Sequence, residues 1–93
     1  MNHSKHRKGE IFLGKNKISK IENVSHLSKL NLIDVQSCRL RSIDGVSELK
    51  DLTSLHLSHN RIESIQNLDQ NIELETVDLS GNPIKSLSGK PQN

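Results

Sequence analysis

The stretch LTSLHLSHNRIESIQNL, residues 52–68, decides the fold of this chain. Its leucines and isoleucines recur at fixed intervals, but the segment is too short and too polar to form a core alone. Leu55 and Leu57 alternate with period two, which is typical of a short strand with one buried face. Ile62 and Ile65 lie three residues apart, which suits a tight turn or a short 3₁₀ segment. The stretch therefore predicts one strand, one bend and one return.

The same spacing recurs along the chain with a period of 22 residues. One copy cannot bury its apolar edge by itself, so the copies must stack and cover one another. We therefore expect a solenoid of about four repeats. The columns that hold across all copies are Ile11, Ile33, Leu55 and Val77; Leu13, Val35, Leu57 and Leu79; Asn16, Cys38, Asn60 and Asn82; Ile18, Leu40, Ile62 and Ile84; and Ile21, Ile43, Ile65 and Leu87.

The third of these columns carries asparagine everywhere except at Cys38. An inward carboxamide can bond the backbone groups that a turn leaves without partners. A metal or redox role for Cys38 is the sharper hypothesis, but the chain contains no second cysteine and a metal site needs several ligands. We therefore predict a structural role for Cys38, no metal site and no cofactor.

Another column mixes only asparagine and glycine: Asn23, Gly45, Asn67 and Gly89. Both residue types tolerate the left-handed backbone conformation, so this column predicts a sharp bend on the return path. One position departs from the apolar pattern, because Asn71 occupies the column of Leu27 and Leu49. We expect the neighbouring Ile72 to turn inward in its place.

The pattern places the repeat domain at residues 10–87, after a basic polar tail (1–9) and before a C-terminal tail (88–93). Lys8 occupies a column that holds leucine in later copies, and the apolar pattern stops after Leu87. Neither end therefore has the cap that a stack of repeats requires. We expect the interior of a longer solenoid or a degenerate short one, and self-association through the uncapped ends.

Composition narrows the class of partner. Thirteen basic against eleven acidic residues give a net charge of +2, and no aromatic residues are interleaved for base stacking, so nucleic acid is not favoured. A basic rim of Lys15, Lys17, Arg39 and Arg61 is the feature that would support it. No segment approaches the roughly 20 apolar residues of a membrane span, and the first residues lack a signal sequence, so we expect a soluble intracellular protein.

Strand residues that alternate with the buried pairs should line one open face. Their central column is the candidate partner-binding site: Phe12, Asp34, His56 and Asp78. His56 between two aspartates, with Ser54 and Ser58 close by, suggests a hydrolase, but nucleophilic catalysis needs an oriented base and an enclosed oxyanion site. An open row gives proximity without enclosure. We therefore predict no enzyme and no small-molecule substrate, with a merely solvated face as the plainest alternative.

The segments IFLGKNKISKIENVSHLSKL (11–30) and LTSLHLSHNRIESIQNL resemble consecutive repeats of the leucine-rich-repeat regulatory subunits of protein phosphatase 1, the 22-residue class. The resemblance covers about residues 10–87 and includes the cysteine copy. It agrees with the fold that the spacing predicts: an α/β leucine-rich-repeat solenoid, with a short parallel sheet on the concave face and 3₁₀ or turn segments on the convex face.

The resemblance implies a noncatalytic protein of nucleus and cytoplasm that binds the phosphatase catalytic subunit through its concave face. In that family, aromatic and acidic residues of the middle strand column make the contact. Phe12 and Asp78 match this pattern, and Asp34 and His56 lie in the same column. Two alternatives stay open: a structural adaptor for another intracellular complex, resembling axonemal or ribonucleoprotein members of the repeat class, and a truncated copy without independent activity.

Overall fold

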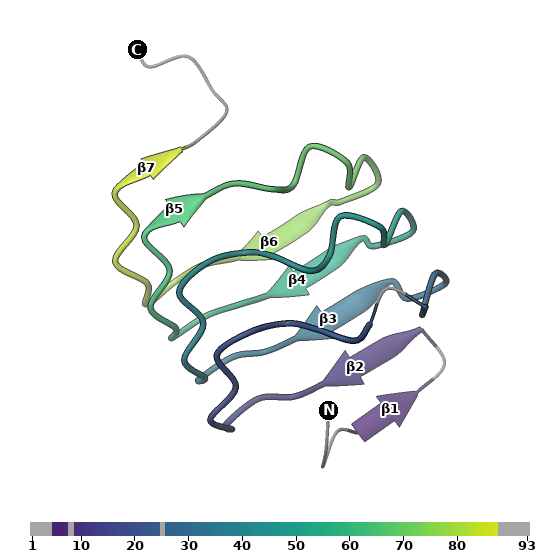
Figure 1. Ribbon diagram of the computed structural model, residues 1–93, viewed down its shortest axis with the longest axis horizontal. Coiled ribbons are helices and arrows are strands. Elements are labelled where there is room, and N and C mark those ends of the chain that lie inside the picture. Colours follow the sequence, from purple (N-terminus) through teal and green to yellow (C-terminus); the bar gives the residue numbers. More distant parts are fainter. Residues whose placement is uncertain (1–4, 8, 25, 88–93) are drawn as a thin grey trace.

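The structure, a computed structural model, describes residues 5–7, 9–24 and 26–87. The chain winds in successive coils, and each coil contributes one short strand to a sheet on one side (Figure 1). This five-stranded sheet has the order β1 (Lys5–Arg7), β2 (Glu10–Phe12), β3 (Leu32–Asp34), β4 (Ser54–His56) and β6 (Thr76–Asp78). A second, two-stranded sheet pairs β5 (Ser64–Ile65) with β7 (Ser86–Leu87) on the return side.

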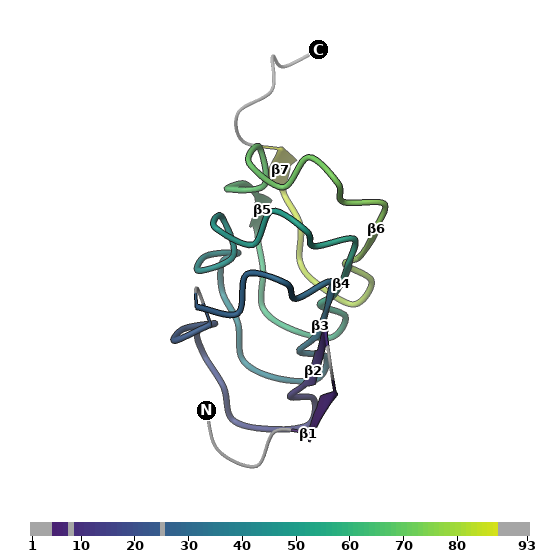
Figure 2. The ribbon, with the colours of Figure 1, turned by 90° about the vertical axis from the view of Figure 1, so that its right-hand side faces the viewer.

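Strands β2, β3, β4 and β6 are parallel, and each pairing joins residues that are one repeat apart. Ile11 lies opposite Ile33, Ile33 opposite Leu55, and Leu55 opposite Val77. Viewed from the side, the sheet forms one wall and the return segments form the other (Figure 2). The short parallel sheet that the repeat spacing predicts is therefore confirmed.

The core lies between these two walls, where the apolar columns stack. Ile33 and Leu55 are 1% and 0% exposed, and Val35 and Leu57 are both 0% exposed. Burying a side chain of this size stabilises the fold by about 1.5–3 kcal/mol. Because the alternating strand pattern sends every second residue inward, a chain with few apolar residues still fills a continuous core.

Backbone hydrogen bonds extend the pairing beyond the strands. The carbonyl oxygens of Gly9, Asn31 and Thr53 each accept two N–H donors from the following coil, over 2.8 to 3.0 Å. On the convex side, Arg39 N donates to Ile18 O at 2.8 Å and Arg61 N to Leu40 O at 2.7 Å. Pro83 occupies the next position in that column and has no N–H, so this series of hydrogen bonds between coils ends there.

The asparagine column satisfies the backbone inside the coil. Asn60 Nδ2 donates to Val35 O at 2.8 Å and to Leu57 O at 3.0 Å, while its Oδ1 accepts from Leu40 N at 3.0 Å. Cys38 is buried in the equivalent place, with Sγ 3.4 Å from both Leu13 O and Gln36 O. The thiol thus replaces the donor half of the carboxamide, which fits the predicted structural role.

The predicted left-handed bend is confirmed at Asn23, Gly45 and Asn67, whose φ angles are 60°, 82° and 65°. The fourth position of this column, Gly89, lies outside the described residues. Gly45 is required for a second reason, because a Cβ there would meet Ile21 O at 2.1 Å. A second left-handed column was not predicted, since its residue types carry no common signal: Lys15, Ser37, His59 and Gly81.

The helical part of the predicted α/β class is not confirmed. Residues 5–7, 9–24 and 26–87 form strands, turns and bends, with no α-helix or 3₁₀ segment among them. The convex side carries turns and the pair β5 and β7 instead. Within the same residues there is no helix of the length and apolarity that a bilayer span requires.

Two local expectations differ from the structure. Residues 5–7, assigned above to the N-terminal tail, form β1 and pair antiparallel with β2; the domain boundaries themselves stay predictions. Ile72 does not turn inward: it is 80% exposed, whereas Asn71 is only 4% exposed. Asn71 Nδ2 donates to Val46 O at 2.9 Å and Leu49 O at 3.1 Å, so these two carbonyls hold the polar side chain inside.

Candidate functional site

The four predicted site residues form one row across the sheet. Phe12 lies opposite Asp34, Asp34 opposite His56, and His56 opposite Asp78, because the parallel strands are in register. Each residue ends its strand, and each side chain is half-buried, between the apolar core and solvent. Neighbouring strands lie about 4.8 Å apart, so the row spans roughly 15 Å.

Both carboxylates of this row bond the backbone just beyond their own strands. Asp34 Oδ1 accepts from Gln36 N at 3.1 Å, and Asp34 Oδ2 accepts from Gln36 Nε2 at 3.1 Å. Asp78 Oδ1 accepts from Ser80 N at 3.0 Å and from Ser80 Oγ at 2.8 Å. A hydrogen bond from the N–H two residues later to an aspartate forms an Asx-turn, which fixes the torsions of the aspartate side chain. The row therefore presents two oriented negative charges.

The Asp78 carboxyl has a pKa below its ordinary value of 3.8. The largest cause is the hydrogen bond from the Ser80 backbone, followed by the bond from the Ser80 hydroxyl. His56 and His59 add a smaller electrostatic contribution in the same direction, while partial desolvation opposes it. Hydrogen bonds to the charged form favour that form, so Asp78 carries a negative charge throughout the physiological pH range.

The serines expected beside His56 do not form a catalytic pair with it. Ser58 is 6% exposed and therefore buried, not part of the open face as predicted. Among the described residues, no hydrogen bond joins His56 to Ser54, Ser58 or either aspartate. The described residues therefore do not show the hydrogen bond between base and nucleophile that a nucleophilic site uses.

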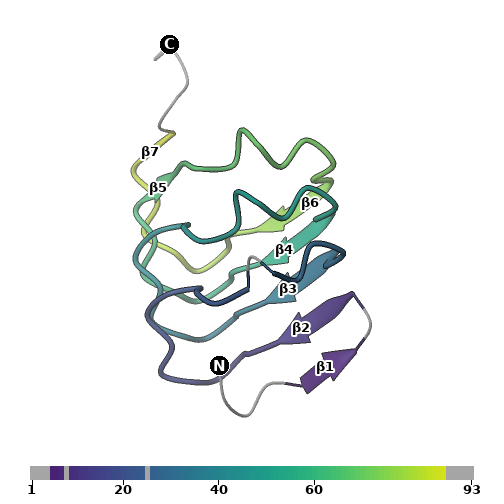
Figure 3. The ribbon, with the colours of Figure 1, turned by 45° about the vertical axis from the view of Figure 1, so that its right-hand side comes forward.

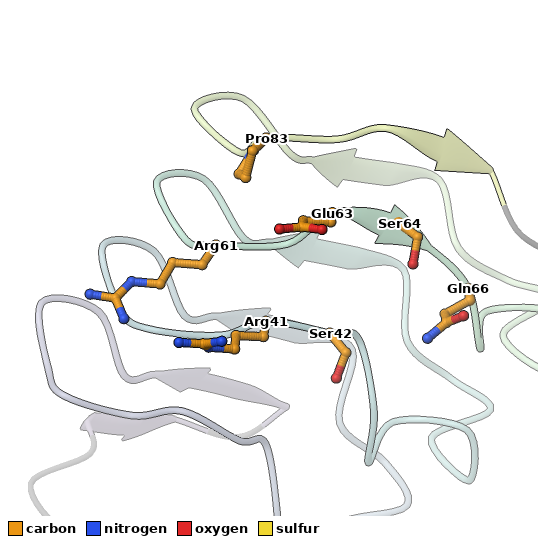
Figure 4. Close-up of a pocket in the computed structure, with 7 residues that line it drawn as sticks. All are labelled: Arg41, Ser42, Arg61, Glu63, Ser64, Gln66 and Pro83. Carbon is orange, nitrogen blue, oxygen red and sulfur yellow. The ribbon is translucent and has the colours of Figure 1, made fainter.

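A groove that the sequence did not predict lies on the convex side. It is an open groove of about 490 Å³ lined by Arg41, Ser42, Arg61, Glu63, Ser64, Gln66 and Pro83 (Figure 4). Glu63 Oε1 lies 3.6 Å from Lys85 Nζ, whereas no carboxylate in the described part of the chain pairs with Arg41 or Arg61. Charges of both signs therefore line this groove.

Three residues of the predicted basic rim, Lys17, Arg39 and Arg61, occupy one column of the repeat and therefore lie on successive coils. Lys15, Lys17, Arg39 and Arg61 are all exposed, and of these only Arg61 lines the groove. Arg41 joins it from a different column of the repeat. The sequence shows arginines at positions 39, 41 and 61, but only the structure shows that Arg41 and Arg61 line the same groove.

Metal binding has no support from residue grouping in the described ranges 5–7, 9–24 and 26–87: no cluster of three or more His, Cys, Asp or Glu side chains occurs there. The row of Phe12, Asp34, His56 and Asp78 combines a phenyl ring, an imidazole and two carboxylates.

Comparison with known protein families gives one finding. Residues 50–92 match the family described as Leucine Rich repeats (2 copies). A comparison with curated proteins gave no significant match. Leucine-rich repeats generally form a non-enzymatic fold for protein interaction. The match and the parallel sheet both fit a leucine-rich-repeat fold, and repeats of this kind suggest a protein-binding module.

Proposed function

We propose that this chain is a noncatalytic regulatory module that binds the catalytic subunit of protein phosphatase 1 through its concave face, in nucleus and cytoplasm. The observation that carries the proposal is the register of four parallel strands, which gathers Phe12, Asp34, His56 and Asp78 into one row. The sequence resemblance supplies the identity of the partner, and the row supplies the aromatic and acidic side chains that the resemblance requires.

The chemistry of the row suits a partner surface with an apolar pocket beside cationic groups. Phe12 has a half-buried ring at one end of the row, so its exposed edge can enter such a pocket. Asp78 at the other end is held as an oriented carboxylate by Ser80. An oriented carboxylate pairs best with an arginine or lysine of a partner.

Capture of the purified catalytic subunit on immobilised chain tests the proposal. We expect wild type to capture the subunit and the double variant Phe12→Ala and Asp78→Ala to lose at least about tenfold in affinity, because both ends of the row are removed. Arg41→Ala, on the convex groove, is the matched control and should capture normally. Equal capture by wild type and double variant would remove the concave face from the mechanism.

A further inference from the structure

The two outer strands of the five-stranded sheet are β1 and β6, and each pairs on one side only within the described residues. They lie at opposite ends of the row of strands (Figure 3). An unpaired strand edge presents backbone N–H and C=O groups that can pair with another strand. Within the described residues the five-stranded sheet therefore has two such edges, one at each end of the stack.

At β6 this edge is open in both backbone and side chains. Thr76 N donates to Thr53 O, and Asp78 O accepts from Leu57 N, so the groups on both sides of Val77 face β4. Successive residues of a strand direct their backbone groups to opposite sides, so Val77 directs its own outward. The Val77 side chain is 37% exposed, although its column partner Leu55 is 0% exposed.

The two edges carry opposite charge. Strand β1 has the sequence Lys5-His6-Arg7, which contains two basic residues and a histidine. Around β6, residues 69–80 contain Asp69, Glu73, Glu75 and Asp78 and no lysine or arginine. Opposite charges across a strand pair stabilise it, whereas like charges directly opposite each other destabilise it.

We propose that copies of this chain associate head to tail, with β6 of one copy pairing antiparallel with β1 of the next. In its own chain, β1 pairs with β2 so that Lys5 is opposite Phe12 and His6 is opposite Ile11. If β1 of the next copy lies against β6 in the register that it has against β2, Lys5 is opposite Asp78, because Asp78 and Phe12 occupy the same position in their strands. Pairing of β6 with β6 would gather the acidic residues, and pairing of β1 with β1 would gather the cationic ones.

Such an interface uses different surfaces on the two copies, so the association does not close on itself as a two-fold dimer does. It is small and partly electrostatic. Interfaces of this size are weak, with dissociation constants of about 0.1–1 mM, and screening by salt weakens them further.

Sedimentation velocity of the full chain over a range of concentrations tests the proposal. At low ionic strength we expect the average mass to rise with concentration, and to fall when salt is raised to about 0.5 M. Lys5→Glu and Asp78→Lys should each weaken association by about tenfold, because each places like charges opposite one another. Glu48→Lys is the matched control, because Glu48 is exposed and lies away from both edges. It changes the net charge by the same amount as Asp78→Lys, so this variant should associate as wild type does.

Mixing the two variants is the decisive step. The reversed charge on β1 of Lys5→Glu then meets the reversed charge on β6 of Asp78→Lys, and association should return to the wild-type level.

Val77→Pro tests the same edge independently, because proline removes the outward N–H and leaves the hydrogen bonds to β4. Circular dichroism checks that this variant folds. A wild type that stays monomeric at low salt, or variants that do not complement, would overturn the proposal. Phosphatase capture is not the readout, so this result is independent of the proposed function.

Discussion

The first and last coils use the same columns of the repeat, yet they differ in burial. Ile11 is 5% exposed and Val77 is 37% exposed, although both lie at the centre of their strands. Leu13 is 1% exposed, while its column partner Leu79 is only partly buried. The first coil is covered by the second coil and bordered by β1, whereas the described residues place no coil beyond β6. Position in the stack, not residue type, therefore decides how much each side chain contributes.

The largest effect on stability should come from two of the glycines with positive φ, Gly45 and Gly81, which lie in different coils. Gly45→Ala is expected to destabilise the fold by about 3–5 kcal/mol, since a Cβ would meet the Ile21 backbone oxygen. At Gly81, the Cβ would meet the side chain of His59, which can move, so Gly81→Ala should cost about 1–2 kcal/mol. Urea unfolding of both variants measures the difference. Equal costs would mean that the backbone contact at Gly45 is relieved elsewhere.

The next effect compares the two ends directly with a pair of identical substitutions. Leu13→Ala removes a fully buried side chain and should cost about 3 kcal/mol, whereas Leu79→Ala should cost about 1 kcal/mol because Leu79 is only partly buried. Thermal and urea unfolding give both values. If Leu79→Ala costs as much as Leu13→Ala, the last coil is covered in solution and the comparison between the ends fails.

A gain in stability is expected at Asn71. Its Oδ1 is buried and has no hydrogen-bond partner within the described structure, and the carbonyls that receive its Nδ2 already accept Leu49 N and Leu52 N. Asn71→Leu should therefore stabilise the protein by about 1 kcal/mol, because it removes an unpaired acceptor and adds apolar burial. Asn60→Leu is the matched control and should destabilise, since Asn60 Oδ1 bonds Leu40 N. A destabilised Asn71→Leu variant would contradict this reasoning.

The smallest effect concerns the Asp78 carboxyl. Its folded-state pKa is lowered from 3.8, so the stability that its charged form contributes is present above that pH and is lost as pH falls through the lowered pKa. Ser80→Ala removes the hydroxyl donor but keeps the backbone N–H, so the pKa should rise only part of the way to its ordinary value. Carbon-detected NMR titration of wild type and variant measures the shift. An unchanged pKa would remove the hydroxyl from its causes.

The row of Phe12, Asp34, His56 and Asp78 could be predicted because a period of 22 residues and a strand period of two leave little freedom. Ser58 could not. It lies two residues beyond His56 and was expected on the same open face, but the chain has already bent out of the strand there and turned the side chain inward. Alternation holds only as long as the backbone stays extended.

The convex side shows the same limit. Ile62 and Ile65 predicted a 3₁₀ segment from their spacing, but the residues between them include the start of β5, which pairs with β7 one repeat later. A spacing of three is compatible with several backbone paths, and hydrogen bonds between coils select among them. The groove of Arg41 and Arg61 follows from that path as well.

The sequence alone determined the repeat, the inward columns, the asparagine bonds and the left-handed bend at Asn23, Gly45 and Asn67, because each follows from side-chain periodicity or from the local chemistry of one residue type. Only the tertiary structure decided the β1 edge, the inward turn of Asn71 and the unequal burial of the two ends. These depend on contacts with the adjacent coil, and the surface that one coil leaves for the next is a property of the stack rather than of any segment.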